Sequence, residues 1–392
     1  KKILERYPTR IPRIYICSKV SPLYRCWRRS GQVMIAPWHD VRVNKDKEGE
    51  GLVMGTKKLV TLCVVALATA AILSFSSSAN ASDAPYPPSP VINRVTFGFS
   101  SRDRRAPGSD NWPITWADDG HQYAAWGDGG GFGGTNSDGR VSLGVARVEG
   151  SRDSYQGNNV WGGKDPENPA RFGGKSYGIL SVGGVLYMWV GPGSNTASYE
   201  EARLCSSTNH GAAWTRAKWA FAKSDSLIMP TLCQFGKDYA GARDNYVYSY
   251  AIRLKGDPSE LGVHKPRQID LLRVPKDKIL DRSSYEFFAG RGADHAPTWT
   301  KDISSREPVF EDPNGVGWCM SVSYNAGLRR YLLCTEHDRS FEGNLGIFDV
   351  SHPWGPWTTV GYYGNWGNFG STFYWNFSNK WLRSDGKHFI LP

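Results

Sequence analysis

The stretch SDNWPITWADDGHQYAAWGDGGGF, residues 109–132, predicts the local structure from which the fold is built. Two aromatic-rich runs, residues 112–116 and 122–126, flank Asp118-Asp119-Gly120. Asp-Gly between alternating runs is a strong hairpin signal, because Gly adopts the positive φ that the turn needs. We therefore expect a β-hairpin whose turn is centred on Asp119.

This register predicts a pair of carboxylates at the open end of the hairpin. Residues equally far from Asp119 face each other, so Asp110 lies opposite Asp128. Directly opposite Cβ atoms are about 4.5–5.5 Å apart, and like charges placed that way are destabilising. The pair is therefore either two solvated turn residues or a functional site. Four nearby aromatic residues resemble a sugar-binding floor and favour the site: Trp112, Trp116, Trp126 and Phe132.

Residues 54–81 have the layout of a secretory signal peptide. Lys57 and Lys58 precede an apolar run over residues 59–75, and Ala79-Asn80-Ala81 has the A-x-A form of a cleavage site. Because the run is about 17 residues long, an uncleaved membrane anchor is the alternative. We interpret residues 1–53 as an upstream, untranslated or non-native leader. Residues 82–392 are then one secreted or periplasmic catalytic domain, without stable membrane association after cleavage.

The positive charge of the chain is concentrated in that leader. The whole chain has 47 Lys+Arg and 37 Asp+Glu, whereas residues 82–392 hold 33 and 32. A nucleic-acid-binding domain needs a basic patch of its own. We therefore expect no nucleic-acid partner, and a monomer whose partner is a polysaccharide or oligosaccharide.

Four cysteines fall in the predicted mature part: Cys205, Cys233, Cys319 and Cys334. Pairing Tyr324 with Arg329 across a turn would put Cys319 opposite Cys334. An exported chain permits a disulfide there, and two free buried thiols are the alternative. No cysteine or histidine spacing matches a zinc site, so we predict no metal and no cofactor.

Short paired strands recur along the mature chain, and long helical periodicity is absent. Hairpin-like units are expected over residues 111–126, 176–190, 227–253, 317–335 and 373–390. Five similar units, each too small to bury its own faces, predict an all-β, five-bladed β-propeller. A two-sheet sandwich is the alternative. RSDGKHFILP, residues 383–392, breaks off inside an expected strand, so we expect the last blade to be truncated.

A recognisable turn supports the propeller. STNHGAAW, residues 207–214, fits the pattern called an Asp-box, with its Asn at 209 and its Trp at 214. This motif occupies the outer hairpin of a blade and is architectural.

Several longer motifs carry a family resemblance. They are the opening stretch, KSYGILSVGGVLYMW from 175, LCQFGKDYAGARDNYVYSY from 232, LLRVPKDKILDRSSYEFF from 271, and SYNAGLRRYLLCTEH from 323 followed by FDVSHPWGPWTTV. They resemble a bacterial family catalogued as a domain of unknown function, whose better understood members are similar to exported endo-D-arabinanases on a five-bladed propeller. The resemblance implies a glycoside hydrolase with Asp110 and Asp128 as its catalytic pair.

Glycoside hydrolysis suits two neighbouring carboxyl groups. One carboxyl must be protonated to donate to the leaving oxygen, and the other must be ionised. Two adjacent carboxylates raise each other's proton affinity, which separates their pKa values and supplies both roles. The sequence leaves open which aspartate is the acid and whether the anomeric configuration is retained.

Other residues at strand ends are expected to reach the same central channel, with solvated or structural roles as the alternative. The predicted substrate-binding residues are Asn111, Trp112, Lys175, Tyr177, Gln234, Arg243, Asp244, Glu336, His337 and Trp375.

Two other functions remain open at this stage. A propeller polysaccharide lyase would need a His or Tyr base beside a cation, and only His121 lies in the opening hairpin, at its opposite end. A non-catalytic carbohydrate-binding propeller would use the aspartates only to accept hydrogen bonds.

Overall fold

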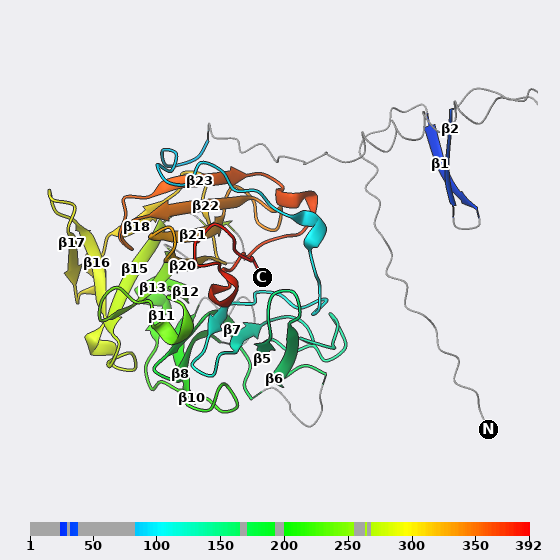
Figure 1. Ribbon diagram of the computed structural model, residues 1–392. Helices are drawn as coiled ribbons and strands as arrows, with labels where there is room; N and C mark the ends of the chain where they lie inside the picture. The colour runs from blue at the N-terminus through cyan, green and yellow to red at the C-terminus, as the bar shows by residue number, and fades with distance from the viewer. Residues whose placement is uncertain are drawn as a thin grey trace, which may run out of the picture. The chain divides into compact units, whose positions relative to one another are not determined.

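Short antiparallel strands form almost all of the regular structure (Figure 1). The computed structural model describes residues 83–164, 171–192, 200–254, 263–264 and 268–392, together with two strands near the N-terminus. Those two, β1 (Tyr24–Arg29) and β2 (Gln32–Pro37), pair as a hairpin in a first unit, Lys1–Ser74. The second unit contains the rest. The predicted signal peptide lies outside the described residues.

Blades 1 and 2 are sheets whose strands follow chain order from the inside outwards. Blade 1 has the order β3-β4-β5-β6, and blade 2 has β7-β8-β9-β10, with β11 also paired to β9. The blade 1 strands are β3 (Ile114–Trp116), β4 (Gln122–Trp126), β5 (Gly144–Glu149) and β6 (Gln156–Trp161). Those of blade 2 are β7 (Lys175–Val182), β8 (Val185–Gly191), β9 (Glu201–Ser207), β10 (Thr215–Arg216) and β11 (Phe221–Ala222).

Blades 3 and 4 repeat this arrangement. Blade 3 comprises β12 (Leu227–Leu232), β13 (Tyr246–Arg253), β15 (Gln268–Pro275), β16 (Glu286–Arg291), β17 (Pro297–Thr300) and β18 (Pro308–Glu311). Blade 4 comprises β20 (Ser321–Asn325), β21 (Arg330–Glu336), β22 (Leu345–Val350) and β23 (Thr358–Tyr363). Two short strands, β14 (Val263–His264) and β19 (Val316–Gly317), pair separately.

The connections contain short 3₁₀ helices. They are η1 (Phe99–Ser101), η3 (Lys223–Asp225), η4 (Lys237–Tyr239), η5 (Arg282–Ser284), η6 (Ile303–Ser305), η7 (Trp366–Asn368) and η8 (Asn379–Trp381). The described part of the chain has no helix with the length and apolar character that crossing a bilayer requires.

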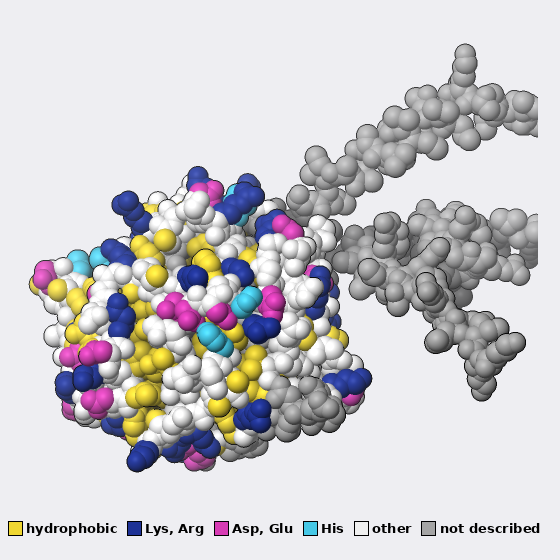
Figure 2. All heavy atoms as spheres, turned by 60° about the horizontal axis from the view of Figure 1, so that its bottom comes forward, with side chains coloured by type: hydrophobic (Ala, Val, Ile, Leu, Met, Phe, Trp, Pro, Cys, Tyr) yellow, Lys and Arg dark blue, Asp and Glu magenta, His cyan; other side chains and the backbone are white. Residues whose placement is uncertain are grey.

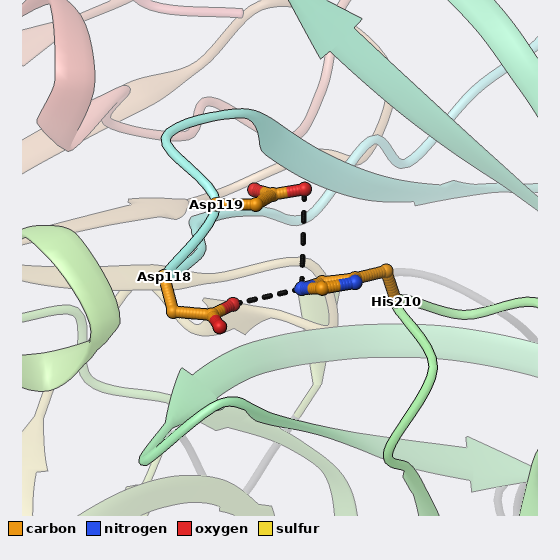
Figure 3. A group of neighbouring side chains, drawn as sticks. All are labelled: Asp118, Asp119 and His210. Atoms are coloured by element: carbon orange, nitrogen blue, oxygen red, sulfur yellow. Dashed lines mark hydrogen bonds and ion pairs between the residues drawn. The ribbon is translucent and has the colours of Figure 1, made fainter.

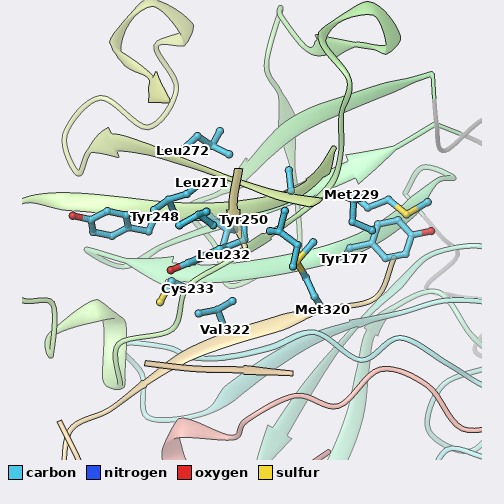
Figure 4. Close-up of a cluster of buried hydrophobic side chains, with 14 of the residues drawn as sticks. Tyr177, Met229, Leu232, Cys233, Tyr248, Tyr250, Leu271, Leu272, Met320 and Val322 are labelled. Carbon is cyan, nitrogen blue, oxygen red and sulfur yellow. The ribbon is translucent and has the colours of Figure 1, made fainter. Parts of the chain in front are cut away.

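The first strand of each blade faces its neighbours around a common centre, which defines the propeller. Ser181 of β7 donates its backbone N–H to Thr115 Oγ1 of β3, at 3.0 Å. Gln234, just after β12, forms a parallel bridge with Ser323 of β20. The largest buried cluster fills the wedges between blades 2, 3 and 4, with aromatic and aliphatic side chains such as Tyr177, Tyr250 and Val322 (Figure 4).

The sequence placed most hairpins correctly. In blade 1, Ile114 pairs with Ala124 and Trp116 with Gln122, which confirms a turn centred on Asp119. In blade 2, Val182 pairs with Val185 around Gly183-Gly184. Both glycines have positive φ, 59° and 75°, as a two-residue hairpin turn that matches the strand twist requires.

The expected fifth unit, residues 373–390, forms no strand, and a five-blade count is not confirmed. Its first part nevertheless runs between the inner strand of blade 4 and the first hairpin of blade 1. Ser321 Oγ donates to the Trp375 carbonyl, and Ser378 Oγ donates to Gln122 Oε1 at 2.6 Å. The predicted turn is present, since Gly386 donates its N–H to the Arg383 carbonyl at 2.9 Å.

The proposed Cys319–Cys334 pairing is wrong. Cys334 pairs with Ser321, because Tyr324 faces Tyr331 rather than Arg329. The turn covers residues 326–329, one position later than the expected 325–328. Cys319 therefore precedes β20 instead of facing Cys334. The four described cysteines are free and buried, which is the alternative that the sequence had left open.

Candidate active site

Asp110 lies just before β3, where the backbone of the first hairpin leaves its regular register. Its N–H and carbonyl bond to the carbonyl and N–H of Gly127, at 2.9 and 3.0 Å. Asp110 therefore faces Gly127, and the prediction that it faces Asp128 is wrong by one residue. The cause is an extra residue on the first strand, where Asn111 and Trp112 adopt left-handed φ values of 72° and 55°. Such bulges redirect side chains and are frequent beside active sites.

The two aspartates still influence each other. The pKa of Asp110 is raised to about 7, mainly by burial and then by the negative charge of Asp128, against the opposing effects of Lys175 and Arg140. Gly127 lets the Asp110 and Asn111 side chains lie close to its backbone, because a Cβ at that position would lie 3.1 Å from Asp110 Oδ1 and 3.2 Å from Asn111 Nδ2. Asp128 itself has a left-handed φ of 50°. Residues held in that region cost about 1–3 kcal/mol each and concentrate at functional sites.

Two cations accompany Asp128. Lys175, the first residue of β7, forms an ion pair with Asp128 Oδ1 through its Nζ, and its side chain is only 3% exposed. Arg140, from the glycine-rich loop after β4, places Nη2 3.6 Å from the same oxygen and also donates to the Asp128 carbonyl. The sequence predicted Lys175 but missed Arg140, because no short-range signal connects position 140 with position 128.

Blade 4 contributes two buried groups on the same side of the propeller. Cys319 Sγ lies 3.7 Å from Asn111 Oδ1. Burial raises the pKa of the Cys319 thiol well above its usual value; Glu336 and Asp110 raise it too, whereas Lys175 lowers it. Glu336 is fully buried, its pKa is raised to about 8 by burial, and its Oε1 accepts the Phe341 N–H at 2.8 Å. Glu336 and Asp110 both act on the Cys319 thiol, so Glu336 lies on the Asp110 side of the propeller but beneath the surface.

Aromatic rings border the aspartates on the blade 1 side. Trp112 stacks on Trp126 with ring centroids 5.6 Å apart and an interplanar angle of 19°. Phe132 meets Trp112 edge-on at 5.3 Å. Trp112 is half-buried, so part of its indole remains accessible. Three of the four rings that the sequence grouped around the pair therefore lie together, whereas Trp116 lies at the turn end of β3.

Three predicted binding residues are not near the pair. The loop that contains Arg243 and Asp244 also contains Asp238, which accepts hydrogen bonds from Ser181 and Gly184 at the far end of β7 from Lys175. Asp244 binds Tyr248, and Gln234 Nε2 donates to the Ile179 carbonyl at 2.7 Å. These residues stand at the opposite end of the inner strands, because they follow β12 whereas Lys175 begins β7.

Three further predicted residues pack inside the protein. His337 pairs with Asp338 at 2.7 Å through Nδ1, and its other ring nitrogen lies 3.2 Å from the Tyr363 carbonyl. Tyr177 meets Trp318 edge-on at 5.3 Å. Trp375 is buried in a hydrophobic cluster that joins the C-terminal segment to blade 4. Their side chains are buried, which favours the structural alternative for each.

A second group of ionisable residues lies at the other end of the first hairpin (Figure 3). His210, from the turn between β9 and β10, places Nε2 2.8 Å from Asp118 Oδ1 and 3.9 Å from Asp119 Oδ2. The hydrogen bond from His210 lowers the pKa of Asp118. One ligand atom from each residue lies within 4.8 Å of the others, so the group has the composition of a cation site. The Tyr123 hydroxyl also donates to Asp119, at 2.8 Å. The contacts of His210 with the two aspartates join blade 2 to blade 1.

The fold and this site define a class: a β-propeller with a carboxylate pair and a buried lysine at the ends of its inner strands. The family model described as Domain of unknown function (DUF4185) matches residues 171–381, more than half of the chain. The chain belongs to this family. The matched part contains Lys175 and Glu336, whereas Asp110 and Asp128 precede it.

Among solved structures, the chain is similar to three propeller enzymes. The GH43_1 enzyme from Xanthomonas citri is 13% identical with a TM-score of 0.41, over 76% of this chain and 82% of that one. RS223-Beta-xylosidase is 10% identical at 0.41, over 72% and 84%. A thermostable family-43 glycoside hydrolase is 12% identical at 0.40, over 72% and 82%. Similarity at this level defines no activity for this chain. The comparison with curated proteins found no match.

Proposed function

We propose that this protein is a secreted glycoside hydrolase that cleaves a furanose-rich, D-arabinan-like polysaccharide. One observation carries the proposal: Asp110 and Asp128 are neighbours in contrasting surroundings. Asp110 is largely buried with a pKa of about 7, whereas Asp128 pairs with Lys175 and Arg140. A glycosidase needs one carboxyl that donates a proton and one that carries charge.

In this proposal, Asp110 is the general acid. As the bond between the anomeric carbon and the glycosidic oxygen breaks, the Asp110 proton passes to that oxygen and the free alcohol leaves. Asp128 either bonds to the anomeric carbon or takes a proton from the water whose oxygen bonds there. In the first case a water that gives its proton to Asp110 then displaces Asp128 from the anomeric carbon, which releases the sugar. Its negative charge stabilises the oxocarbenium-like transition state, and Lys175 and Arg140 orient its carboxylate. The anomer formed first, observed by NMR, distinguishes the two routes.

The accessible part of the Trp112 ring supports a sugar as the substrate. Aromatic faces stack on apolar sugar faces, while carboxylates accept hydrogen bonds from hydroxyl groups. The lyase alternative receives less support, because its base would have to be an accessible His or Tyr. His337 is buried against Tyr362, with ring centroids 3.6 Å apart, and His121 lies at the turn end of the hairpin.

The test is reducing-sugar release from a panel of arabinans and galactans by the full chain. Asp110→Asn and Asp128→Asn should each lower activity by about 10²–10⁴-fold, the usual contribution of a catalytic carboxyl. Asp153→Asn is the matched control, because that side chain is 79% exposed and pairs only with Arg152 among the described residues. In the wild type, kcat/KM should fall about tenfold per pH unit above pH 7, as Asp110 loses its proton.

Three outcomes would contradict the proposal. Full activity in both aspartate variants would exclude this pair. Absorbance of a new unsaturated uronate would identify a lyase. Affinity for a polysaccharide without product would identify a carbohydrate-binding propeller.

A further inference from the structure

A cavity of about 1160 Å³ separates blade 1 from blade 4. Its floor is apolar, with Ile114 and Ala124 from blade 1 and Leu332 and Ile347 from blade 4. The segments around residues 91–106 and 386–392 form much of the remaining lining. The cavity is therefore bounded by two blades and two connecting segments rather than enclosed within one blade.

The cavity begins beside the candidate catalytic pair. Ser109 and Trp112, on either side of Asp110-Asn111, both line it, as does Phe132. Further aromatic rings follow along its wall, including Tyr155 and Trp381, which lie 5.3 Å apart. A polymer bound at Asp110 would thus meet this cavity as its next binding surface.

The lining of the cavity is strongly cationic. We call its five arginines the arginine wall; they are Arg94, Arg102, Arg104, Arg105 and Arg152. Lys387 adds a further positive charge, and Asp103 is the one acidic residue in the lining. Residues 82–392 as a whole hold 33 basic and 32 acidic residues, and both kinds are interspersed over the face drawn in Figure 2. The arginine wall is therefore a local concentration of charge.

The arginines of the wall are exposed, and several are oriented by aromatic rings. Arg102 lies over the Phe369 ring at 4.2 Å, and Arg105 lies over the Tyr155 ring at 4.7 Å. Arg105 also pairs with Asp103 at 2.6 Å. Within the described residues, Arg94 and Arg104 have no ion-pair or hydrogen-bond partner. Their guanidinium groups are therefore available to an external anion.

We propose that the arginine wall binds anionic substituents, carboxylate, sulfate or phosphate, on the polysaccharide whose backbone is cleaved at Asp110. That the ligand is a polysaccharide rests on the proposed function. That it is negatively charged rests on the arginines of the cavity. Guanidinium groups pair with such anions through two parallel hydrogen bonds. The aromatic rings between the arginines supply the stacking surface that a sugar chain needs.

The test compares a neutral arabinan with the same arabinan after partial carboxymethylation. Binding is measured with the full-length Asp110→Asn variant, in which cleavage is suppressed. At low salt we expect roughly tenfold tighter binding of the carboxymethylated polymer, because several exposed ion pairs add. Raising the salt to 0.5 M should remove most of this preference, since the charges are exposed to solvent.

Substitutions then locate the preference. Adding Arg94→Gln and Arg104→Gln should weaken binding of the carboxymethylated polymer roughly fivefold and leave the neutral polymer unchanged. Lys218→Gln with Lys278→Gln is the matched control, because it removes two exposed positive charges from blades 2 and 3, away from the cavity. These four residues contribute no described ion pair, so the substitutions leave no acidic group unpaired.

Three results would overturn this inference. They are equal affinity for the two polymers, an equal loss in the control variant, and binding of DNA of matched charge as tightly as the carboxymethylated polymer. The inference and the proposed function fail separately. Absence of cleavage by the wild type would contradict the hydrolase, whereas cleavage without any charge preference would contradict the arginine wall.

Discussion

Replacing Asp110 with Asn should stabilise the protein, and the gain should grow with pH. An aspartate titrates near 3.8 when unfolded, whereas Asp110 titrates at about 7 in the folded protein. The folded state therefore binds this proton more tightly than the unfolded state does. Folding stability from this group is highest below pH 4 and falls as the pH rises from about 4 to 7. Above pH 7 the penalty stays constant.

The size of the effect follows from the difference in pKa. About 3 pKa units at 1.36 kcal/mol each give about 4 kcal/mol as the upper limit above pH 7. For a domain of this size, 1 kcal/mol shifts Tm by about 2 °C, so the variant should melt up to about 8 °C higher than the wild type at pH 8. At pH 4 the two should melt within about 1 °C of each other, because the folded Asp110 is protonated and the unfolded aspartate is only about half ionised.

Thermal unfolding followed by circular dichroism between pH 4 and 8 measures this difference. Asp277→Asn, at an exposed position of blade 3, serves as the control and should follow the wild type throughout. Parallel curves for Asp110→Asn and wild type over the whole range would refute the assignment of Asp110 as the buried, high-pKa carboxyl. The assay needs no substrate, so it is independent of the proposed activity.

Three further predictions concern the surroundings of the pair. Lys175→Met should raise the pKa of Asp110, because Lys175 lowers it in the wild type, and the alkaline limb of the pH–rate profile should move to higher pH. Gly127→Ala should lower kcat roughly tenfold, because its Cβ would lie 3.1 Å from Asp110 Oδ1, while Tm changes by only a few degrees; an unchanged kcat would show that the carboxyl tolerates displacement. His210→Ala should raise the pKa of Asp118, measured by NMR titration, because it removes the hydrogen bond that lowers it. The same variant should leave activity unchanged, since Asp118 lies at the other end of the hairpin.

Local signals in the sequence were sufficient for the hairpins. Asp119-Gly120 and Gly183-Gly184 determine turns through the positive φ of glycine, and side chains then alternate with a period of two. The site depended on a smaller detail. The pairing of the first hairpin is regular from the turn back to residue 113. Beyond that point, the two left-handed residues Asn111 and Trp112 shift the register by one position. Asn is enriched in this conformation, but no propensity predicts it for Trp112.

The predicted site residues lie at two opposite ends of the propeller's inner strands. Lys175 begins an inner strand and Glu336 ends a second strand, so both lie on the Asp110 side. Arg243 and Asp244 precede the second strand β13 and lie on the opposite side. Strand direction is sufficient to assign each residue to one end of the propeller, because neighbouring antiparallel strands begin at opposite ends, and the sequence pattern contains that information. The sequence does not predict the burial of His337 and Trp375, because this burial arises from packing between segments distant in the chain.

The contacts of residues 376–378 with blade 1 have a consequence for the order of folding. Asn376 Nδ2 donates to the Asn111 carbonyl at 3.2 Å, and Ser378 Oγ donates to Gln122, across sequence separations of 265 and 256 residues. Hairpins within one blade form from near neighbours, whereas ring closure must overcome the loop entropy of almost the entire domain. We expect the blades to form before the ring is closed. On a ribosome, the segment next to Asp110 would then stay incomplete until residue 378 has left the exit tunnel, which makes the aspartate pair one of the last parts of the molecule to mature.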